Sequence, residues 1–96
     1  MTAVSIITPW LNASELCEIY EKSCSGAQVV VYDNGSDWFH AEKIAQMVKR
    51  LGGIYLRSEK NQSFSAANNR GLALATGDIV IFMNNDVECR PGWLDL

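Results

Sequence analysis

The sequence predicts an α/β fold, a Rossmann-like parallel sheet with helices on both faces. Short apolar runs rich in Val and Ile alternate along the chain with longer segments whose apolar residues recur at intervals of three and four. The runs are apolar at nearly every position, which is typical of strands buried on both faces. Strands that alternate with helices form right-handed crossovers and therefore a parallel sheet. We expect one domain spanning residues 1–96.

Four strands are predicted, each bounded by turn-forming residues, a proline or polar residues. Pro9 stops the first strand, and the turn-forming residues Asp33-Asn34-Gly35-Ser36 end the second. The continuous apolar pattern of the first strand indicates a central place in the sheet. The predicted ranges are Val4–Thr8, Ala27–Asp33, Ile54–Arg57 and Asp78–Met83.

Three helices are predicted between the strands. The first begins with Asn12 as its N-cap and Glu15 as the reciprocal acid, and Gly52-Gly53 closes the second. The third spans Ser63–Gly77, with Gly77 as its C-terminal stop. Gly71 inside this helix costs about 1 kcal/mol relative to Ala, which indicates a close approach of the helix to the sheet. The apolar faces consist of Leu16, Ile19 and Tyr20 in the first helix and Ile44, Met47, Val48 and Leu51 in the second.

Composition argues against several classes of function. Eight Lys and Arg against eleven Asp and Glu give a net charge of −3, and no basic run exceeds Lys49-Arg50, so we expect no nucleic-acid partner. The longest apolar run is far shorter than the roughly 20 residues that span a bilayer, and no signal-peptide pattern is present. We therefore expect no membrane span and a cytoplasmic location. Cys17, Cys24 and Cys89 form no C-x-x-C pair, which indicates reduced thiols rather than disulfides or a zinc site.

Polar side chains follow the predicted strands at the points where the strands end. Because ligands of parallel sheets bind at the carboxyl ends of the strands, we expect Asp33, Asn84, Asn85 and Asp86 to lie at one edge. Asp33 follows three valines and a tyrosine, so its carboxylate requires hydrogen-bond donors. A loop amide and a ligand N–H are both open as donors, and the Asn-Gly step that follows is typical of a turn.

The stretch Asn84-Asn85-Asp86 gathers hard oxygen donors directly after a strand. Mg²⁺ and Mn²⁺ suit such a site, since they are bound by one or two carboxylates while phosphate oxygens and water complete the coordination. Acidic turns are common, so the spacing alone does not establish a metal site.

Three segments resemble, in order and spacing, the nucleotide-binding half of the family-2 glycosyltransferases, which have the GT-A fold. They are VSIITPWLN from Val4, VVVYDNGSDW from Val29 and NQSFSAANNRGLALATGDIVIFMNNDVECRPGWL from Asn61. The resemblance covers essentially the whole chain. Within the family it looks most like the branch with N-x-G-F-x-x-A-x-N-x-G and L-N-x-D segments, which includes rhamnosyltransferase-like enzymes of cell-surface polysaccharide synthesis. It implies the strand order 3-2-1-4.

The resemblance implies roles for five residues. It places Pro9 in the loop beside the nucleobase. It implies that Asp33 accepts a hydrogen bond from the imide N–H of the nucleobase. Asn69 matches an asparagine in the family's third helix and is implied in donor binding. Asn84 and Asp86 match the first and last positions of the family's D-x-D element. There the first residue commonly meets the ribose, and the last binds a divalent ion, Mn²⁺ or Mg²⁺, on the diphosphate.

Three positions depart from the family's pattern. Asn84 replaces the commoner Asp, as in the L-N-x-D branch, and one carboxylate fewer weakens metal binding. Asn68 stands where many relatives have Arg, so a charged contact is missing. Ser63 replaces a glycine, which changes how closely that loop approaches the substrate.

The implied function is the donor-binding portion of an inverting glycosyltransferase, which transfers a sugar from a UDP-sugar or dTDP-sugar to a glycan or other acceptor. In the family, the catalytic base lies well downstream of the D-x-D element, so no residue is assigned as the base and we expect weak nucleotide binding without transfer. The alternative is a non-catalytic nucleotide-binding or assembly module that retains the half-fold. A flavodoxin-like or receiver-like domain is disfavoured, because phosphate-cradling glycines and a phospho-acceptor pattern are absent.

Self-association is a further expectation. Relatives cover the fourth-strand side of the sheet with later strands and helices. We expect an open edge and apolar surface here, with Trp93 and Leu94 at the start of a helix after Pro91, and a homodimer that buries this surface.

Overall fold

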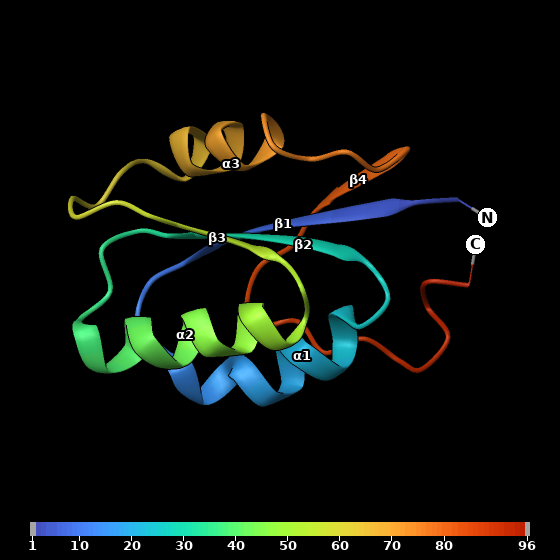
Figure 1. The fold of residues 1–96 in the computed structure, drawn as a ribbon, viewed down its shortest axis with the longest axis horizontal. Helices are drawn as coiled ribbons and strands as arrows, with labels where there is room; N and C mark the ends of the chain where they lie inside the picture. The colour runs from blue at the N-terminus through green and yellow to red at the C-terminus, as the bar shows by residue number, and fades with distance from the viewer. Residues whose placement is uncertain (1, 96) are drawn as a thin grey trace.

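The computed structural model describes residues 2–95 and contains a parallel sheet between two layers of helices (Figure 1). The strands are β1 (Val4–Trp10), β2 (Gln28–Asp33), β3 (Ile54–Arg57) and β4 (Ile79–Phe82). They run parallel in the order β3-β2-β1-β4. This confirms the predicted fold class and the predicted strand order.

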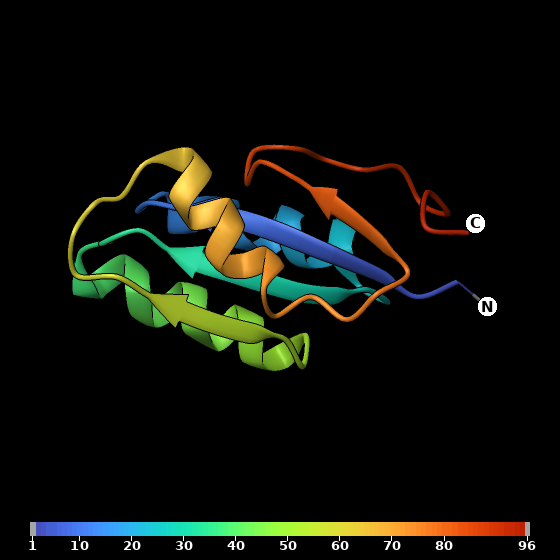
Figure 2. The ribbon, with the colours of Figure 1, turned by 90° about the horizontal axis from the view of Figure 1, so that it is seen from above.

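The helices lie on both faces of the sheet. On one face are α1 (Cys17–Cys24), which follows the 3-10 turn η1 (Ser14–Leu16), and α2 (Trp38–Arg50). On the other face α3 (Phe64–Leu72) crosses β1 and β2 (Figure 2). The segment after β4 passes beyond the sheet edge and returns toward α1.

The core lies mainly between the sheet and the layer of α1 and α2. Trp10 and Tyr20 pack edge to face with ring centroids 5.0 Å apart. The Tyr20 hydroxyl is 2.7 Å from Thr8 Oγ1, so these two buried hydroxyl groups hydrogen-bond to each other. The fully buried apolar residues of this layer are Ile6, Trp10, Tyr20, Cys24, Val29, Val31, Ile44, Met47 and Val48.

β1 continues through Pro9 instead of stopping there. Backbone groups of a strand point alternately toward its two neighbours. The Ile7 carbonyl accepts a bond from the residue after β4 (3.0 Å), and the Trp10 carbonyl accepts one from Asn34 N (2.7 Å), so the backbone of Pro9 faces the β4 side. β4 has already ended at this level, so the N–H that proline lacks costs no ladder bond.

The start of α1 differs from the prediction, because Asn12 does not cap it. Asn12-Ala13 adopts the left-handed conformation, with φ of 52° and 50°. The Asn12 side chain instead accepts from Asp37 N (2.9 Å), while its backbone N–H donates to Ser36 Oγ (2.7 Å). The helix face that packs inward contains Tyr20 but leaves Ile19 exposed, contrary to the predicted face.

α3 ends at Leu72, earlier than predicted, and Gly77 is not its stop. Gly77 N donates to Ser5 Oγ (2.8 Å), and a Cβ on Gly77 would lie 2.6 Å from Ser5 N. This glycine is therefore required where the chain crosses close to β1 before entering β4.

The prediction that every strand is buried on both faces is wrong for β3 and β4. β3 is half-buried throughout, and Phe82 of β4 is 53% exposed because α3 lies over β1 and β2. Trp93 and Leu94, predicted at the open apolar surface, pack instead against the core. The exposed large apolar residues of α3 and β4 are Phe64, Leu72, Ile79 and Phe82.

Within residues 2–95, no helix combines the length and apolar character needed to cross a bilayer. The three cysteines are free thiols. Burial raises the pKa of the Cys17 thiol to about 11 and that of Cys24 to about 12, so neither forms a reactive thiolate near neutral pH.

Gly71→Ala tests how closely α3 packs on β1. A Cβ at Gly71 would lie 2.5 Å from Ile7 Cγ2. Helix propensity alone favours Ala by about 1 kcal/mol, but overpacking costs about 1–3 kcal/mol, so we expect a net loss of stability of about 1 kcal/mol, seen as a lower urea midpoint. Ser65→Ala, on the exposed side of α3, is the control. A midpoint at or above that of the wild type would contradict the close packing.

Candidate functional site

A hollow of about 480 Å³ lies at the carboxyl ends of the strands. The loops after all four strands contribute to it, which is where open α/β sheets bind their ligands. Its volume falls within the roughly 300–1,000 Å³ typical of small-molecule sites. The lining residues are Pro9, Trp10, Leu11, Ala13, Asn34, Asn61, Gln62, Phe64, Asn84, Asn85 and Asp86.

The structure brings together three of the five residues predicted to bind the donor. Pro9, Asn84 and Asp86 all line the hollow. Asn69 is exposed on α3 and lines a separate hollow between α3 and β4. Asp33 lines neither hollow. The roles assigned to these residues stay predictions. The placement of Pro9, Asp33, Asn84 and Asp86 near the strand ends follows from the topology.

Asp33 is fully buried, with 0% exposure, and both of its oxygens have donors within the chain. Oδ1 accepts from Ser36 N (2.8 Å), and Oδ2 accepts from the Tyr55 hydroxyl (2.5 Å) and from Arg57 Nη1 (3.3 Å). The loop amide left open as a partner is thus present. Burial, and then the hydrogen bond to Asp33, raise the pKa of Tyr55, so its hydroxyl stays a donor. A ligand such as the predicted nucleobase can reach this carboxylate only if the turn after β2 moves.

Arg57 connects this buried charge to the surface. Its Nε donates to Glu59 Oε1 (3.3 Å), and its guanidinium lies 4.3 Å from the centroid of the Trp38 ring. Stacking on Trp38 orients the planar guanidinium toward Asp33, which an ammonium group could not reproduce.

Asn34 joins the loop after β2 to the loop after β3, a role that sequence reasoning missed. Its Nδ2 donates to Asn61 Oδ1 (2.6 Å) and to the Gln62 carbonyl (2.7 Å), and its Oδ1 accepts from Gln62 N (2.6 Å). All three residues line the hollow. The Asn-Gly step predicts a turn, and no local signal in the sequence indicates that the amide side chain reaches 27 positions further along the chain.

The rim beside β1 has an unusual backbone. Ala13, which lines the hollow, has φ of 50°, a conformation that a residue with a Cβ rarely adopts. The Trp10 indole donates to the Asn12 carbonyl (2.6 Å), and the bonds from Asn12 to Ser36 and Asp37 hold the same segment from the other side. Such enforced backbone conformations concentrate at functional sites.

Asp86 supplies the one carboxylate of the hollow lining and is exposed, with Asn84 exposed and Asn85 half-buried beside it. Within residues 2–95, no group of three or more His, Cys, Asp or Glu gathers that could hold a metal by itself. One carboxylate with neighbouring amide oxygens fits Mg²⁺ or Mn²⁺ only when phosphate oxygens and water complete the coordination. The donor set therefore suits a metal that arrives with a phosphorylated ligand.

Comparison with known proteins decides the family. The sequence matches the family described as Glycosyl transferase family 2 over residues 5–95. The chain belongs to this family. Polypeptide N-acetylgalactosaminyltransferase 5 of Caenorhabditis elegans is 32% identical over 71 residues, 71% of this chain. Amylovoran biosynthesis glycosyltransferase AmsB of Erwinia amylovora is 35% identical over 94 residues, 88% of this chain.

The fold agrees with a solved structure of the S. aureus protein TarS, residues 1–349. That structure superposes on 97% of this chain with a TM-score of 0.82 and 20% sequence identity, which shows a shared fold. The chain spans a fraction of these proteins' lengths: 11% of the nematode protein, 31% of AmsB and 30% of the TarS chain. Its family-2 membership and GT-A-like fold are thus established, as the motifs had implied.

Asp33→Ala tests whether the buried carboxylate holds the strand ends together. The change leaves the Ser36 amide, the Tyr55 hydroxyl and Arg57 without their acceptor, so we expect a loss of about 2–3 kcal/mol in the free energy of unfolding. Chemical denaturation measures it. Asp37→Ala is the matched control, because Asp37 is exposed and its side chain makes no capping bond, and we expect a change within about 0.5 kcal/mol. Equal stabilities of the two variants would show that Asp33 has no such role.

Proposed function

We propose that this chain is the donor-binding part of an inverting glycosyltransferase, which transfers a sugar from a UDP-sugar or dTDP-sugar to a glycan or other acceptor. The single observation that carries this proposal is the meeting of Pro9, Asn84 and Asp86 around one hollow in a chain of family 2. A hollow at the strand ends, with one exposed carboxylate among amides, suits a nucleotide diphosphate that brings its own metal ion.

Each predicted residue has a role in this proposal. The base lies against Pro9 at the end of β1, the ribose meets Asn84, and Asp86 holds Mn²⁺ or Mg²⁺ on the diphosphate. Asn69 contacts the donor from α3, outside the main hollow. Asp33 accepts the base N–H only after the turn at Ser36 releases Oδ1, the carboxylate oxygen that has a single donor.

The chemistry follows from charge. Cleavage of the sugar–phosphate bond leaves negative charge on the departing diphosphate, and a divalent ion at Asp86 supplies the compensating charge. Asn84 and Pro9 orient the nucleotide so that the sugar is presented in one geometry. Inversion also requires a base for the acceptor hydroxyl, and we assign none within this chain. The rhamnosyltransferase-like branch, polysaccharide synthesis and a cytoplasmic location rest on the sequence alone.

The alternative is a non-catalytic nucleotide-binding or assembly module. It shares the hollow and the metal carboxylate with the enzyme. Binding and transfer together separate the two functions: weak, Mn²⁺-dependent binding of UDP or dTDP without labelled product is expected of the donor-binding part, whereas tight binding without product supports the module. Labelled product from UDP-sugar or dTDP-sugar with mixed acceptors would contradict both, since it would show that this chain alone is catalytically complete.

Asp86→Ala tests the metal site. Because Asp86 is the charged ligand of the hollow, we expect the Mn²⁺-dependent part of the affinity for UDP or dTDP to fall at least about tenfold, or roughly 1.4 kcal/mol, in calorimetric titration. Affinity measured with a chelator stays unchanged. Glu88→Gln is the control, since Glu88 is also an exposed carboxylate but lies outside the hollow. If Mn²⁺ increases the affinity of Asp86→Ala for UDP or dTDP as much as that of the wild type, Asp86 is not a ligand of the metal.

We also propose that a second copy of the chain covers the apolar surface beside β4. This strand is uncharged, within residues 2–95 it pairs with β1 alone, and exposed Phe82 lines the same hollow as exposed Phe64. Sedimentation at tens of micromolar is expected to show a dimer, and Phe82→Lys is expected to dissociate it. Phe39→Lys, at an exposed aromatic position on α2, leaves the dimer intact. A monomeric wild-type chain would refute the homodimer.

A further inference from the structure

The turn that carries Asp86 is held at its two ends. Before the turn, Met83 N donates to the Ile7 carbonyl (3.0 Å). After it, Cys89 N donates to Ser23 Oγ (2.9 Å). Between these anchors, residues 84–88 make no hydrogen bond to another segment of the chain within residues 2–95. The place of the Asp86 carboxylate therefore depends on the two anchors.

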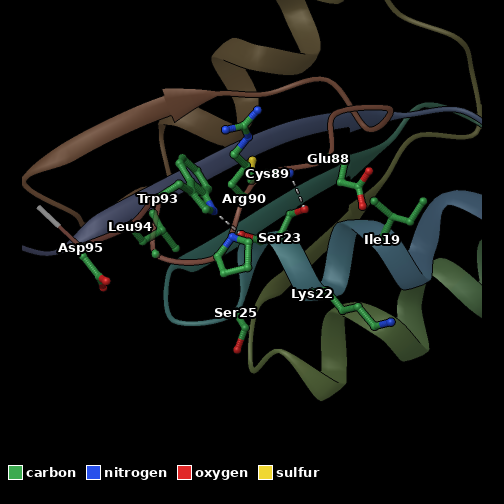
Figure 3. A pocket seen from close by; sticks show the side chains of 12 residues that line it. Ile19, Lys22, Ser23, Ser25, Glu88, Cys89, Arg90, Trp93, Leu94 and Asp95 are labelled. Carbon is green, nitrogen blue, oxygen red and sulfur yellow. Dashed lines mark hydrogen bonds between the residues drawn. The ribbon is translucent and has the colours of Figure 1, made fainter.

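The second anchor consists of two hydrogen bonds, both accepted by Ser23. The Trp93 indole Nε1 donates to the Ser23 carbonyl (2.6 Å), so both the side chain and the backbone of Ser23 accept from the segment after the turn (Figure 3). Ser23 is buried in the last turn of α1, where helix carbonyls have no partner inside the helix. Trp93 thus satisfies a carbonyl that would otherwise need another donor. We call the Cys89–Ser23 and Trp93–Ser23 bonds the Ser23 latch.

Apolar contacts support the Ser23 latch. Cys89, Trp93 and Leu94 all pack against the buried core, and Met83 lies against Cys24, the residue next to Ser23, with their sulfur atoms 3.9 Å apart. The latch is separate from the donor hollow: the residues of the latch line a second hollow of about 400 Å³, and no residue lines both (Figure 3). Ser23 and Trp93 therefore act on the donor hollow only through the chain that joins them to Asp86.

We propose that Ser23 and Trp93 are positioning residues that fix Asp86 for the divalent ion. The inference rests on the proposed function, since it assigns the latch to the metal end of the donor site. A turn anchored at both ends presents its carboxylate in a narrow set of positions. With the latch removed, the metal has to order residues 84–88 when it binds, and that ordering opposes binding.

The test uses variants that remove one hydrogen bond each. Ser23→Ala removes the acceptor of Cys89 N, and Trp93→Phe keeps an aromatic ring but removes the N–H donor. Loss of one such bond is expected to weaken Mn²⁺-dependent binding of UDP or dTDP about three- to tenfold, with affinity in the presence of a chelator unchanged. Ser23→Thr retains the hydroxyl and restores the metal-dependent affinity.

Ser25→Ala is the matched control. Ser25 lies two residues beyond Ser23, is exposed and makes no side-chain hydrogen bond within residues 2–95. Equal Mn²⁺-dependent affinities of Ser23→Ala and Ser25→Ala would overturn the proposal. A purely structural role for Ser23 would lower stability without separating the affinities measured with Mn²⁺ and with chelator.

Amide hydrogen exchange gives a readout that does not need a nucleotide. Exchange at Cys89, whose amide is the hydrogen-bonded donor of the latch, is expected to accelerate in Ser23→Ala and in Trp93→Phe, but not in Ser25→Ala. If the wild-type chain binds no nucleotide diphosphate, the proposed function fails, and the exchange rates still decide the latch. Unchanged exchange at Cys89 in Ser23→Ala would overturn it.

Discussion

The carboxylate of Asp33 is a charge without access to water, and its need for donors joins the ends of β2 and β3. It accepts from the turn after β2 through Ser36 and from β3 through Tyr55 and Arg57. A buried charge that loses its partners costs several kcal/mol, so one of these segments moves away only when another donor takes its place. In the sheet, Asp33 also lies opposite Trp10, the last residue of β1, so the same constraint reaches the β1 side of the donor hollow.

The donor hollow is therefore bounded by two sides that are held in different ways. The loops after β1, β2 and β3 are tied together by the Asn34 amide and by the backbone around Asn12, and they form a wall that is ordered before any ligand arrives. Among the described residues, the turn that carries Asp86 is held only at its two ends, by the bond from Met83 to Ile7 and by the Ser23 latch. Binding to a pre-ordered wall costs little conformational entropy, whereas binding to a tethered turn adds the cost of ordering it. In the proposed function, recognition of the nucleotide and binding of the metal would thus depend on separate parts of the chain.

The sheet and its helices could be predicted from the sequence because continuous apolar runs and helical periodicity are local signals, and the strand order followed from the family resemblance. The errors arose where a distant contact decides a local conformation. Asn12 has the spacing of an N-cap, but the turn after β2 binds its side chain and its backbone adopts positive φ. Gly77 has the position of a helix stop, but its contact is with Ser5. Asn34 was interpreted as a turn residue, and its bonds to the loop after β3 have no local signature.

The pairing of β4 with β1 has a consequence for the order of folding. β1 pairs with β2 and β2 with β3 across short connections, whereas Val4 meets Ile79 near the far end of the chain. Closing the longer loop costs more chain entropy, and contacts between distant residues form late. We therefore expect β1 to β3 to assemble first, with β4 added last. Asp86 follows soon after β4, so the carboxylate proposed to hold the metal would be the last part of the hollow to form. A metal ion would then stabilise the finished domain by mass action, without serving as a nucleus for its folding.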